Sequence, residues 1–473
     1  MTASRRPIAA LTLAVACLLL LLIRPTTAYL HLQTIDGDEC TFGGAHDNYV
    51  VTTCTNSTGA QSIYVWRCLK DLGGEPTCAT LAIIQSPDLT PLGSEFNSTG
   101  IQVARAVVGN DSYTAIAATI YDPVTGWTGT PFYYCAHFDP DVDVANCSVI
   151  YGMDIGGFNN NPVGHIAWDP EPNNYWQYVA ITRGIAPVWD ITTATMGVSI
   201  YKCNMQMDPD GFPWGLCTRT LDISYYPYPY IINFTVALSD AFLAVGDPMA
   251  LNGRGVVHTR DCTTLYAGAF GGSCVTLEDI AAPNGLPGDH FGGGVILNPE
   301  IPDSTQRTII AASPGAPLPL GAVGGYSTLL CDALSDGGGC TVVQFWYAPF
   351  IPDNGPTVSP NFGAGYGLSS VLTDSSTVTV YIGAQHAHVD LGEVYVYTCG
   401  QGIVCAKTRA SIFADEGVVS DGFGGSVGVT DWLTAVGSHT STFIMAISPP
   451  VGLRRAVGGS ATRRASPLAS TLL

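Results

Sequence analysis

The residues in this chain with the clearest capacity for chemistry are its cysteines, which occur as near neighbours. Of fifteen cysteines, Cys17 lies in an apolar N-terminal segment, which leaves fourteen. These form seven pairs: Cys40/Cys54, Cys68/Cys78, Cys135/Cys147, Cys203/Cys217, Cys262/Cys274, Cys331/Cys340 and Cys399/Cys405. An even count in a chain with an export signal favours disulfides over metal-bound thiolates. We therefore expect seven local disulfides, although spacing alone does not prove the connectivity.

Alternating oxygen-bearing side chains offer a place for a calcium ion at Asp169, Glu171 and Asn173, and Asp139, Asp141 and Asp143 also alternate, inside the Cys135/Cys147 hairpin. Calcium takes six to eight oxygen ligands, which a single carboxylate does not organise. The isolated aspartates at comparable turns elsewhere are therefore better explained as Asx-turn residues. We expect no required cofactor, with calcium possible at Asp169, Glu171 and Asn173, or at the alternative set in the hairpin.

No pattern of side chains predicts catalysis. The segment from Gly424 to Gly428 matches the G-x-S-x-G nucleophile elbow, but that motif needs a strand-to-helix turn, and here a strand is predicted. His386, His388 and Asp390 are possible zinc ligands, yet no further Cys/His cluster supports them. We expect a protein that is not an enzyme.

Aromatic residues concentrate in segments that the pattern assigns to loops. They are Trp127, Trp189, Tyr225, Tyr226, Tyr228, Trp346 and Tyr347. Rigid aromatic rings on a stable scaffold are typical of surfaces that recognise proteins or sugars. For any single ring, the alternative is packing between sheets.

The elements that hold these residues belong to a repeat. A pattern of strand, small residue, loop, strand, Cys, hairpin, Cys, strand recurs at Tyr49–Cys78, Tyr113–Cys147, Tyr178–Cys217, Phe242–Cys274, Thr308–Cys340 and Thr377–Cys405. The alternating residues of Thr377–Ile382 are typical of a half-buried strand. A period near sixty residues with four strands predicts an all-β fold, a β-propeller.

The two ends of the repeat region complement each other. A seventh copy, Phe423–Ser448, has no cysteine hairpin and no fourth strand, while Tyr29–Ile35 stands alone at the front. We expect a seven-bladed propeller of four-stranded antiparallel blades, in which this N-terminal strand completes the last blade and closes the ring. In such blades the loop between strands two and three shares a face with the crossing to the next blade. We call this the long-loop face, and the opposite one, with the cysteine hairpins, the stapled face.

Several short motifs resemble a known family. Phe291-Gly292, Phe362-Gly363 and Phe423-Gly424 each begin a repeat, and the segments from Gly383 to Gln385 and from Gly392 to Tyr395 resemble the "GAP" and "GxVY" positions of FG-GAP repeats. Those repeats form the seven-bladed head of integrin α subunits. The resemblance implies a propeller used for adhesion or ligand binding. The integrin legs, membrane helix and family calcium loop do not occur in this sequence, so we expect a related propeller and not an integrin subunit.

The sequence also predicts domain boundaries and compartment. Arginines, an apolar run and small residues predict a cleaved signal peptide at 1–28, with an uncleaved anchor as the alternative. The propeller would occupy 29–448, and a basic Pro/Gly/Ser-rich tail, 449–473, is expected to be disordered. Five N-glycosylation sequons fit an exported glycoprotein: Asn56, Asn97, Asn110, Asn146 and Asn233.

The net charge of the chain limits the classes of partner that it can bind. All 38 acidic residues but only 11 of the 18 basic ones lie between Tyr29 and Ser448, a net charge of −27. Such a field repels nucleic acid. We expect a secreted protein that recognises an extracellular protein or matrix ligand through its long-loop face. The alternatives are a propeller lectin that binds glycans, or a polysaccharide hydrolase or lyase.

Overall fold

The structure is a computed structural model, and it describes the central part of the chain with gaps. The described ranges are 30–35, 40–55, 61–69, 77–84, 101–110, 113–121, 128–129, 132–137, 145–150, 166–170, 176–185, 195–207, 213–227, 234–267, 272–282, 285–298, 306–317, 323–332, 339–347, 363, 367–374, 376–387, 391–400, 404–407, 411–412, 422–438 and 441–446. Within these ranges, no helix has the length and apolar character needed to cross a membrane. The predicted signal peptide and basic tail lie outside the described residues.

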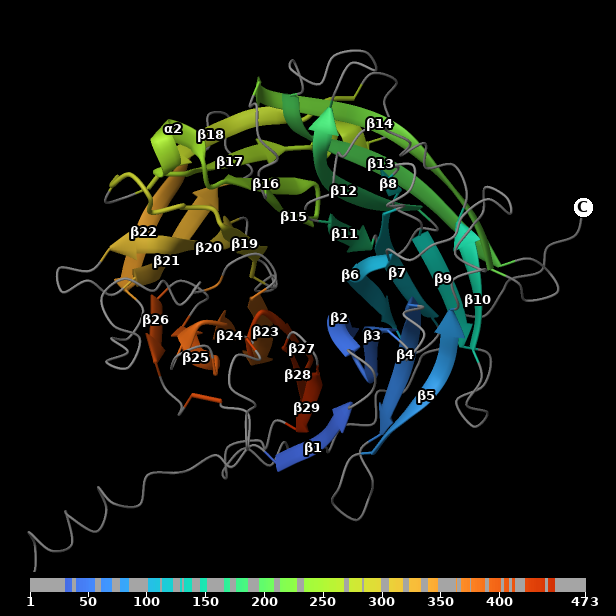
Figure 1. Ribbon diagram of the computed structural model, residues 1–473. Helices are drawn as coiled ribbons and strands as arrows, with labels where there is room; N and C mark the ends of the chain where they lie inside the picture. The colour runs from blue at the N-terminus through green and yellow to red at the C-terminus, as the bar shows by residue number, and fades with distance from the viewer. Residues whose placement is uncertain are drawn as a thin grey trace, which may run out of the picture.

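The chain is an all-β propeller of antiparallel sheets, and the first strand of each sheet lies nearest the common axis (Figure 1). The first sheet contains β2 (Cys40–His46), β3 (Tyr49–Thr55), β4 (Gln61–Leu69) and β5 (Thr77–Ile84). The second contains β6 (Ile101–Asn110), β7 (Tyr113–Tyr121), β9 (Phe132–His137) and β10 (Ala145–Ile150), and the short β8 (Thr128–Gly129) pairs with β7. The third contains β11 (Ile166–Pro170), β12 (Trp176–Ile185), β13 (Thr195–Met207) and β14 (Pro213–Pro227).

The remaining sheets follow the same order from the axis outward. The fourth contains β15 (Thr235–Ser239), β16 (Phe242–Asp247), β17 (Val256–Asp261) and β18 (Val275–Ala281), with the short helices α2 (Ala250–Gly253) and α3 (Thr263–Tyr266). The fifth contains β19 (Gly294–Leu297), β20 (Gln306–Pro317), β21 (Val323–Asp332) and β22 (Cys340–Tyr347). The sixth contains β23 (Leu368–Asp374), β24 (Thr377–Ala384), β25 (Glu393–Gly400) and β26 (Val404–Lys407). The last contains β27 (Ser426–Val429), β28 (Leu433–Gly437), β29 (Thr442–Ala446) and β1 (Leu30–Ile35). Six sheets have the expected four strands, and the second has an extra strand, β8, that the repeat did not predict.

The first strand of the chain pairs with the last one. β1 runs antiparallel to β29, with Leu30 opposite Ala446 and Ile35 opposite Thr442. The neighbouring first sheet contacts this pair directly, because the Thr442 hydroxyl donates to the Cys40 carbonyl oxygen over 3.2 Å. The N-terminal strand therefore completes the last sheet, as the unpaired strand pattern predicted.

The core lies between the sheets. Phe242 of the fourth sheet, for example, packs in one buried cluster with Val295 and Ile309 of the fifth. The central strand β24 is buried from Val378 to Ala384. The prediction of a half-buried strand at Thr377–Ile382 was wrong, because a propeller covers both faces of its middle strands with neighbouring sheets.

The Phe-Gly starts join one sheet to the next. The backbone of Phe423, which is fully buried, bridges Gly392 at the start of β25 in the preceding sheet. A Cβ atom at Gly392, where φ is +81°, would lie 2.0 Å from the Phe423 carbonyl oxygen. Gly255 and Phe291 repeat this contact between the fourth and fifth sheets. Each of these Phe-Gly starts therefore makes a close backbone approach that requires glycine on the facing segment, at Gly392 or Gly255.

All seven predicted cysteine pairs are disulfide-bonded. Cys40–Cys54 joins the first two strands of its sheet. The six other bonds close the hairpin between the third and fourth strands of their sheets, as the shared local context indicated.

A bulge follows the second cysteine in four of the outermost strands. In β5, β14, β18 and β22 the register with the preceding strand shifts at the third residue after the cysteine, at Leu81, Thr220, Leu277 and Val343. A bulge re-aims the residue that follows it. In two of these strands, that residue bonds to the next sheet.

These two residues are Glu278 and Gln344, each four positions after its cysteine. The Glu278 carboxylate accepts from the Cys340 amide over 2.5 Å. The Gln344 side chain accepts from the Cys405 amide over 2.9 Å and donates to the Cys405 carbonyl over 3.4 Å. These bonds join the outermost strands of the fourth, fifth and sixth sheets at the disulfides.

Candidate functional site

Two loops of the long-loop face are joined along the fourth sheet, and together we call them the double loop. One is 248–255, between β16 and β17, and the other is 285–293, between β18 and β19. The amides of Gly288 and His290 both donate to the Gly253 carbonyl over 3.0 Å, and the Phe291 amide donates to the Arg254 carbonyl over 3.1 Å. The inter-strand loop and the sheet crossing therefore share a face here, as strand order predicted.

A buried aspartate anchors each half of the double loop. Asp247, fully buried, accepts through Oδ1 from the amides of Met249 and Ala250. Asp289, 2% exposed, accepts through Oδ2 from the Leu286 amide over 3.1 Å. Burial raises the pKa of the Asp289 carboxyl. Both carboxylates face the backbone of their own loops, so neither is available to solvent.

The double loop is held in a backbone conformation that its side chains disfavour. Leu251 has φ +53°, Asn252 has φ +64° and His290 has φ +53°. A left-handed leucine costs about 1–2 kcal/mol relative to ordinary helical geometry. Such conformations persist where the surroundings determine them, and they concentrate at functional sites.

The strained segment presents apolar side chains to solvent. Met249 is 40% exposed, Leu251 54% and Leu286 48%. Three large apolar side chains are therefore exposed on two joined loops, whereas single exposed apolar residues are ordinary. The arrangement suits the binding of an apolar partner surface.

The end of β22 adds aromatic surface to the same face of the neighbouring fifth sheet. Trp346 is 37% exposed and Tyr347 40%. Tyr347 pairs with Gly325 of β21, and Gly325 pairs with Ser313 of β20. Two residues further on, the Gly315 amide donates to the Asp289 carbonyl of the double loop over 3.1 Å. A continuous backbone path thus connects the strand end that carries the exposed rings to the double loop.

Tyr225, by contrast, packs between the third and fourth sheets. Its ring lies 4.5 Å from the His258 ring, and its hydroxyl accepts from Arg260 Nε over 3.2 Å. The Arg260 guanidinium stands 5.3 Å from the centre of the Tyr225 ring. Burial raises the pKa of the Tyr225 hydroxyl, since its ionised form would lose solvation. This predicted ligand-face residue therefore has a structural contact.

The other predicted aromatic residues stay predictions. The backbone of Tyr226 belongs to β14, and nothing is described of its side chain. Trp127, Trp189 and Tyr228 lie outside the described residues.

Of the predicted calcium ligands, only Asp169 is described, and it is already engaged. Asp169 is buried at the end of β11, and its Oδ2 accepts from the Tyr266 hydroxyl over 2.8 Å and from the Ala241 amide over 3.4 Å. Burial raises the pKa of this carboxyl, and the bond from Tyr266 acts in the opposite direction. Glu171 and Asn173 lie outside the described residues, so calcium binding there stays a prediction.

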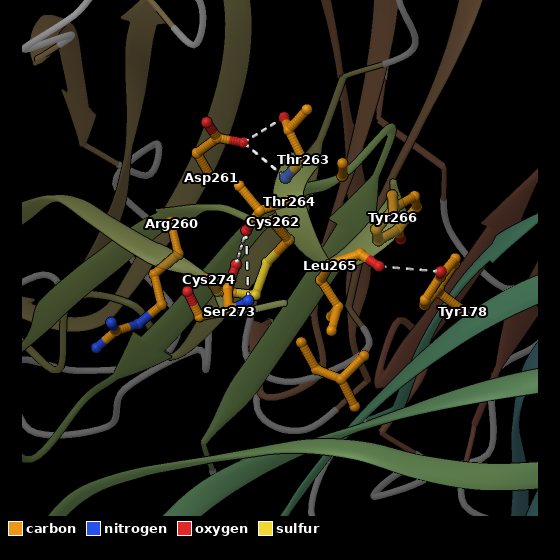
Figure 2. Close-up of a disulfide and its surroundings, with 12 residues drawn as sticks. Tyr178, Arg260, Asp261, Cys262, Thr263, Thr264, Leu265, Tyr266, Ser273 and Cys274 are labelled. Atoms are coloured by element: carbon orange, nitrogen blue, oxygen red, sulfur yellow. Dashed lines mark hydrogen bonds between the residues drawn. A yellow bond between two sulfur atoms is a disulfide. The ribbon is translucent and has the colours of Figure 1, made fainter. Parts of the chain in front are cut away.

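The hairpin that carries Tyr266 shows how a disulfide shapes the stapled face (Figure 2). Cys262–Cys274 closes a segment whose first turn, α3, is fixed by Asp261, which accepts from the Thr263 amide over 2.8 Å. The Leu265 carbonyl accepts a hydrogen bond from the Tyr178 hydroxyl of the third sheet over 3.4 Å. The Tyr266 ring stacks on the Tyr178 ring, with 3.7 Å between the ring centres. The described residues of this hairpin form a contact between the third and fourth sheets.

Two of the five sequons fall in described strands. Asn110 ends β6, and Asn146 lies in the outermost strand β10. Asn56, Asn97 and Asn233 lie outside the described residues. Glycosylation at all five stays a prediction.

Comparison with known proteins adds little. No family model matches the chain, and no curated protein matches it. Solved structures similar to it include the WD40 domain of SCAP from fission yeast, at 8% identity and a TM-score of 0.36, over 90% of this chain and 97% of that one. The hemagglutinin-neuraminidase of parainfluenza virus 5, solved with the ligand DANA, is similar at 6% identity and a TM-score of 0.35, over 89% and 93% of the two chains. Similarity at this level carries no argument about family or function.

Sequence reasoning missed the double loop. Aromatic residues drew attention to Tyr225 and Trp346, whereas Met249, Leu251 and Leu286 stand in no repeated pattern. The Asn252-Gly253 pair, a strong signal for a left-handed turn, was the available sign.

Proposed function

We propose that this protein is a secreted binding propeller that recognises an extracellular protein through the double loop and the adjoining end of β22. The observation that supports this most is the exposure of Met249, Leu251 and Leu286 on two loops that are joined and anchored from below. Preorganised loops lose little conformational entropy on binding, so exposed apolar contacts there contribute more to affinity. Trp346 and Tyr347 extend the surface with rings of the kind enriched at interface centres.

The architecture we propose is a single closed ring of seven blades related to FG-GAP repeats. The pairing of β1 with β29 and the contact of the last sheet with the first support closure. The backbone approach at Gly392 and Phe423 gives the repeat's Phe-Gly start a physical role. Secretion after cleavage behind Ala28 is supported by seven disulfides, which persist in oxidising compartments.

The experiment begins with the full chain expressed in a secreting eukaryotic cell. A mature protein in the medium whose sequence starts at Tyr29 would support export and cleavage. The purified protein is then screened against an array of extracellular and matrix proteins, and each partner is retested with Leu251→Ser and Leu216→Ser. Leu216, on β14, is 52% exposed and serves as the matched control for Leu251 at 54%.

We expect Leu251→Ser to weaken partner binding at least tenfold while Leu216→Ser leaves it unchanged. Equal effects of the two substitutions would place recognition elsewhere. Failure to bind any arrayed protein, together with full retention inside the cell, would contradict the proposal as a whole.

A lectin is the second candidate, and the exposed rings of Trp346 and Tyr347 favour it. Aromatic rings stack on the apolar faces of sugars. A glycan array that gives a signal abolished by Trp346→Ala and unaffected by Leu251→Ser would select this function over protein binding.

A further inference from the structure

One cation in the double loop is unlike the other described basic residues. Arg254 is exposed, and within the described part of the chain its side chain makes no hydrogen bond or ion pair. Every other arginine or lysine whose side chain is described has a partner: Arg67, Lys202, Arg219, Arg260 and Arg307.

This isolation stands out because the protein is strongly acidic. Its body carries 38 acidic residues against 11 basic ones, so an exposed arginine would ordinarily stand near a carboxylate. The two segments of the double loop contain one acidic residue, Asp289, and it is buried and bonded to the Leu286 amide. Arg254 lowers the pKa of that carboxyl, against the larger effect of burial, without forming an ion pair with it.

Arg254 is an exposed cation on the same fixed loop as Met249 and Leu251. Its carbonyl is fixed by the Phe291 amide, and it is three residues from the exposed Leu251. Arginine is enriched among the residues that dominate binding energy, since it combines charge, a flat surface and several donors. A carboxylate bound by its guanidinium gains charge-assisted hydrogen bonds that a neutral group does not offer.

We propose that the partner is an acidic apolar peptide segment, in which a carboxylate binds Arg254 and a large apolar side chain within three residues of it packs on Leu251, Met249 and Leu286. This inference rests on the proposed function and names the chemistry of its ligand. It runs against the field of the whole molecule, which attracts basic partners. Specificity then comes from one local cation in an acidic surface, and basic segments that approach the body find no carboxylate in the double loop.

The opposition between local and overall charge gives a distinctive salt dependence. Long-range repulsion slows the approach of an acidic peptide, and salt screens it over about 10 Å at 0.1 M. Association should therefore become faster as salt increases from low concentration. A basic peptide held by the acidic body would associate more slowly under the same change.

The test uses the full secreted chain and a displayed library of random dodecapeptides. We expect the enriched peptides to carry Asp or Glu within three residues of Leu, Phe or Trp. The most enriched peptide is synthesised together with a version in which its acidic residue is replaced by the amide. Binding is measured against the wild type, Arg254→Glu, Arg254→Lys and the matched surface control Arg219→Gln.

Arg254→Glu should lower the affinity for the acidic peptide at least tenfold, and Arg254→Lys should lower it by a smaller factor. Arg219→Gln should have no effect, and the amide peptide should bind the wild type and Arg254→Glu equally. Unchanged thermal unfolding would show that the substituted proteins remain folded. Enrichment of basic peptides would overturn the inference, as would an acidic peptide that binds Arg254→Glu as well as the wild type.

The outcomes separate this inference from the proposed function. Basic or neutral peptides that still depend on Leu251 would leave the binding surface in place and remove only the role of Arg254. No enriched peptide at all, or enrichment that is indifferent to both Leu251 and Arg254, would overturn both.

Discussion

At Leu251 the chain adopts a left-handed conformation next to a second one at Asn252. Asparagine accepts this geometry readily, and leucine does so at a cost of about 1–2 kcal/mol. The cost is accepted at a position where the side chain is 54% exposed and contributes little to the core. An exposed apolar side chain in a backbone conformation that it disfavours agrees with the proposed role of Leu251 in binding.

Leu251→Asn tests this explanation. We expect the free energy of unfolding to stay the same or to rise by up to about 1 kcal/mol, since asparagine relieves the strain. Binding to the protein partner should fall at the same time. Urea unfolding followed by tryptophan fluorescence gives the first quantity. A loss of more than about 1 kcal/mol would mean that Leu251 stabilises the monomer.

Gly392 is a second residue at which backbone geometry determines identity. Alanine there would combine a disfavoured φ of +81° with a Cβ 2.0 Å from the Phe423 carbonyl. We expect Gly392→Ala to lower the free energy of unfolding by roughly 2 kcal/mol or more. Gly400, at the other end of β25, is the matched control, because a Cβ there would meet nothing within 4 Å. If both substitutions cost the same, the contact with Phe423 is not what requires glycine.

At the scale of elements, the outermost strands form hydrogen bonds to the next sheet that the cysteine pattern did not predict. The second cysteine of each hairpin was visible in the sequence, and so was the pairing that it makes. The bulge at Leu277 that directs Glu278 toward Cys340 was not visible, because a bulge depends on the register of two strands. Glu278 and Gln344 occupy equivalent positions in their repeats with different side chains, so no residue type shared between the repeats marked these positions.

Glu278→Ala measures one of these bonds. It leaves the Cys340 amide without its acceptor in a residue that is 7% exposed, which should cost about 1–3 kcal/mol. Glu278→Gln keeps an acceptor of similar length, as Gln344 does in the next sheet, and should cost less than half as much. Chemical unfolding of the two variants in parallel provides the comparison. Equal losses would show that the charge of Glu278, and not its bond to Cys340, is what stabilises the sheets.

For the whole molecule, the sequence predicted the architecture well because the repeat encodes it many times. Cysteine spacing predicted the seven disulfides, and the repeated pattern of strands predicted a propeller. The unpaired segment before Cys40 predicted that an N-terminal strand completes the last sheet. The candidate site was predicted only in part. Trp346 and Tyr347 are exposed, and their role in binding stays a prediction. Tyr225 packs against His258, because the contact between two sheets is not visible in one segment of sequence. The double loop depends on backbone bonds between distant segments, and composition does not report them.

Removing residues 29–35 would test the role of β1. We expect a lower unfolding temperature and less secreted protein, since β29 would lose the strand paired along Thr442 to Ala446. Removing residues 449–473 is the control and should leave the unfolding temperature unchanged. Comparable unfolding temperatures for both truncated proteins would mean that β1 adds nothing to the last sheet.

Calcium dependence is tested by chelation. We expect excess EDTA to leave the unfolding temperature unchanged, because the Asp169 carboxylate is already occupied by the Tyr266 hydroxyl and the Ala241 amide. A fall in unfolding temperature that added calcium reverses, and that Asp169→Asn abolishes, would establish a calcium site.

The pairing of β1 with β29 also determines how long β1 remains unpaired during synthesis of the chain. The first strand to leave the ribosome finds its partner only after about 400 more residues have been made. At roughly 5–20 residues per second, that interval is about 20–80 s. During it, the local hairpins can close their disulfides one by one, while the first sheet waits with an uncovered flank. The nascent chain therefore exposes that flank for the whole interval, and a premature stop anywhere before Thr442 leaves it permanently uncovered.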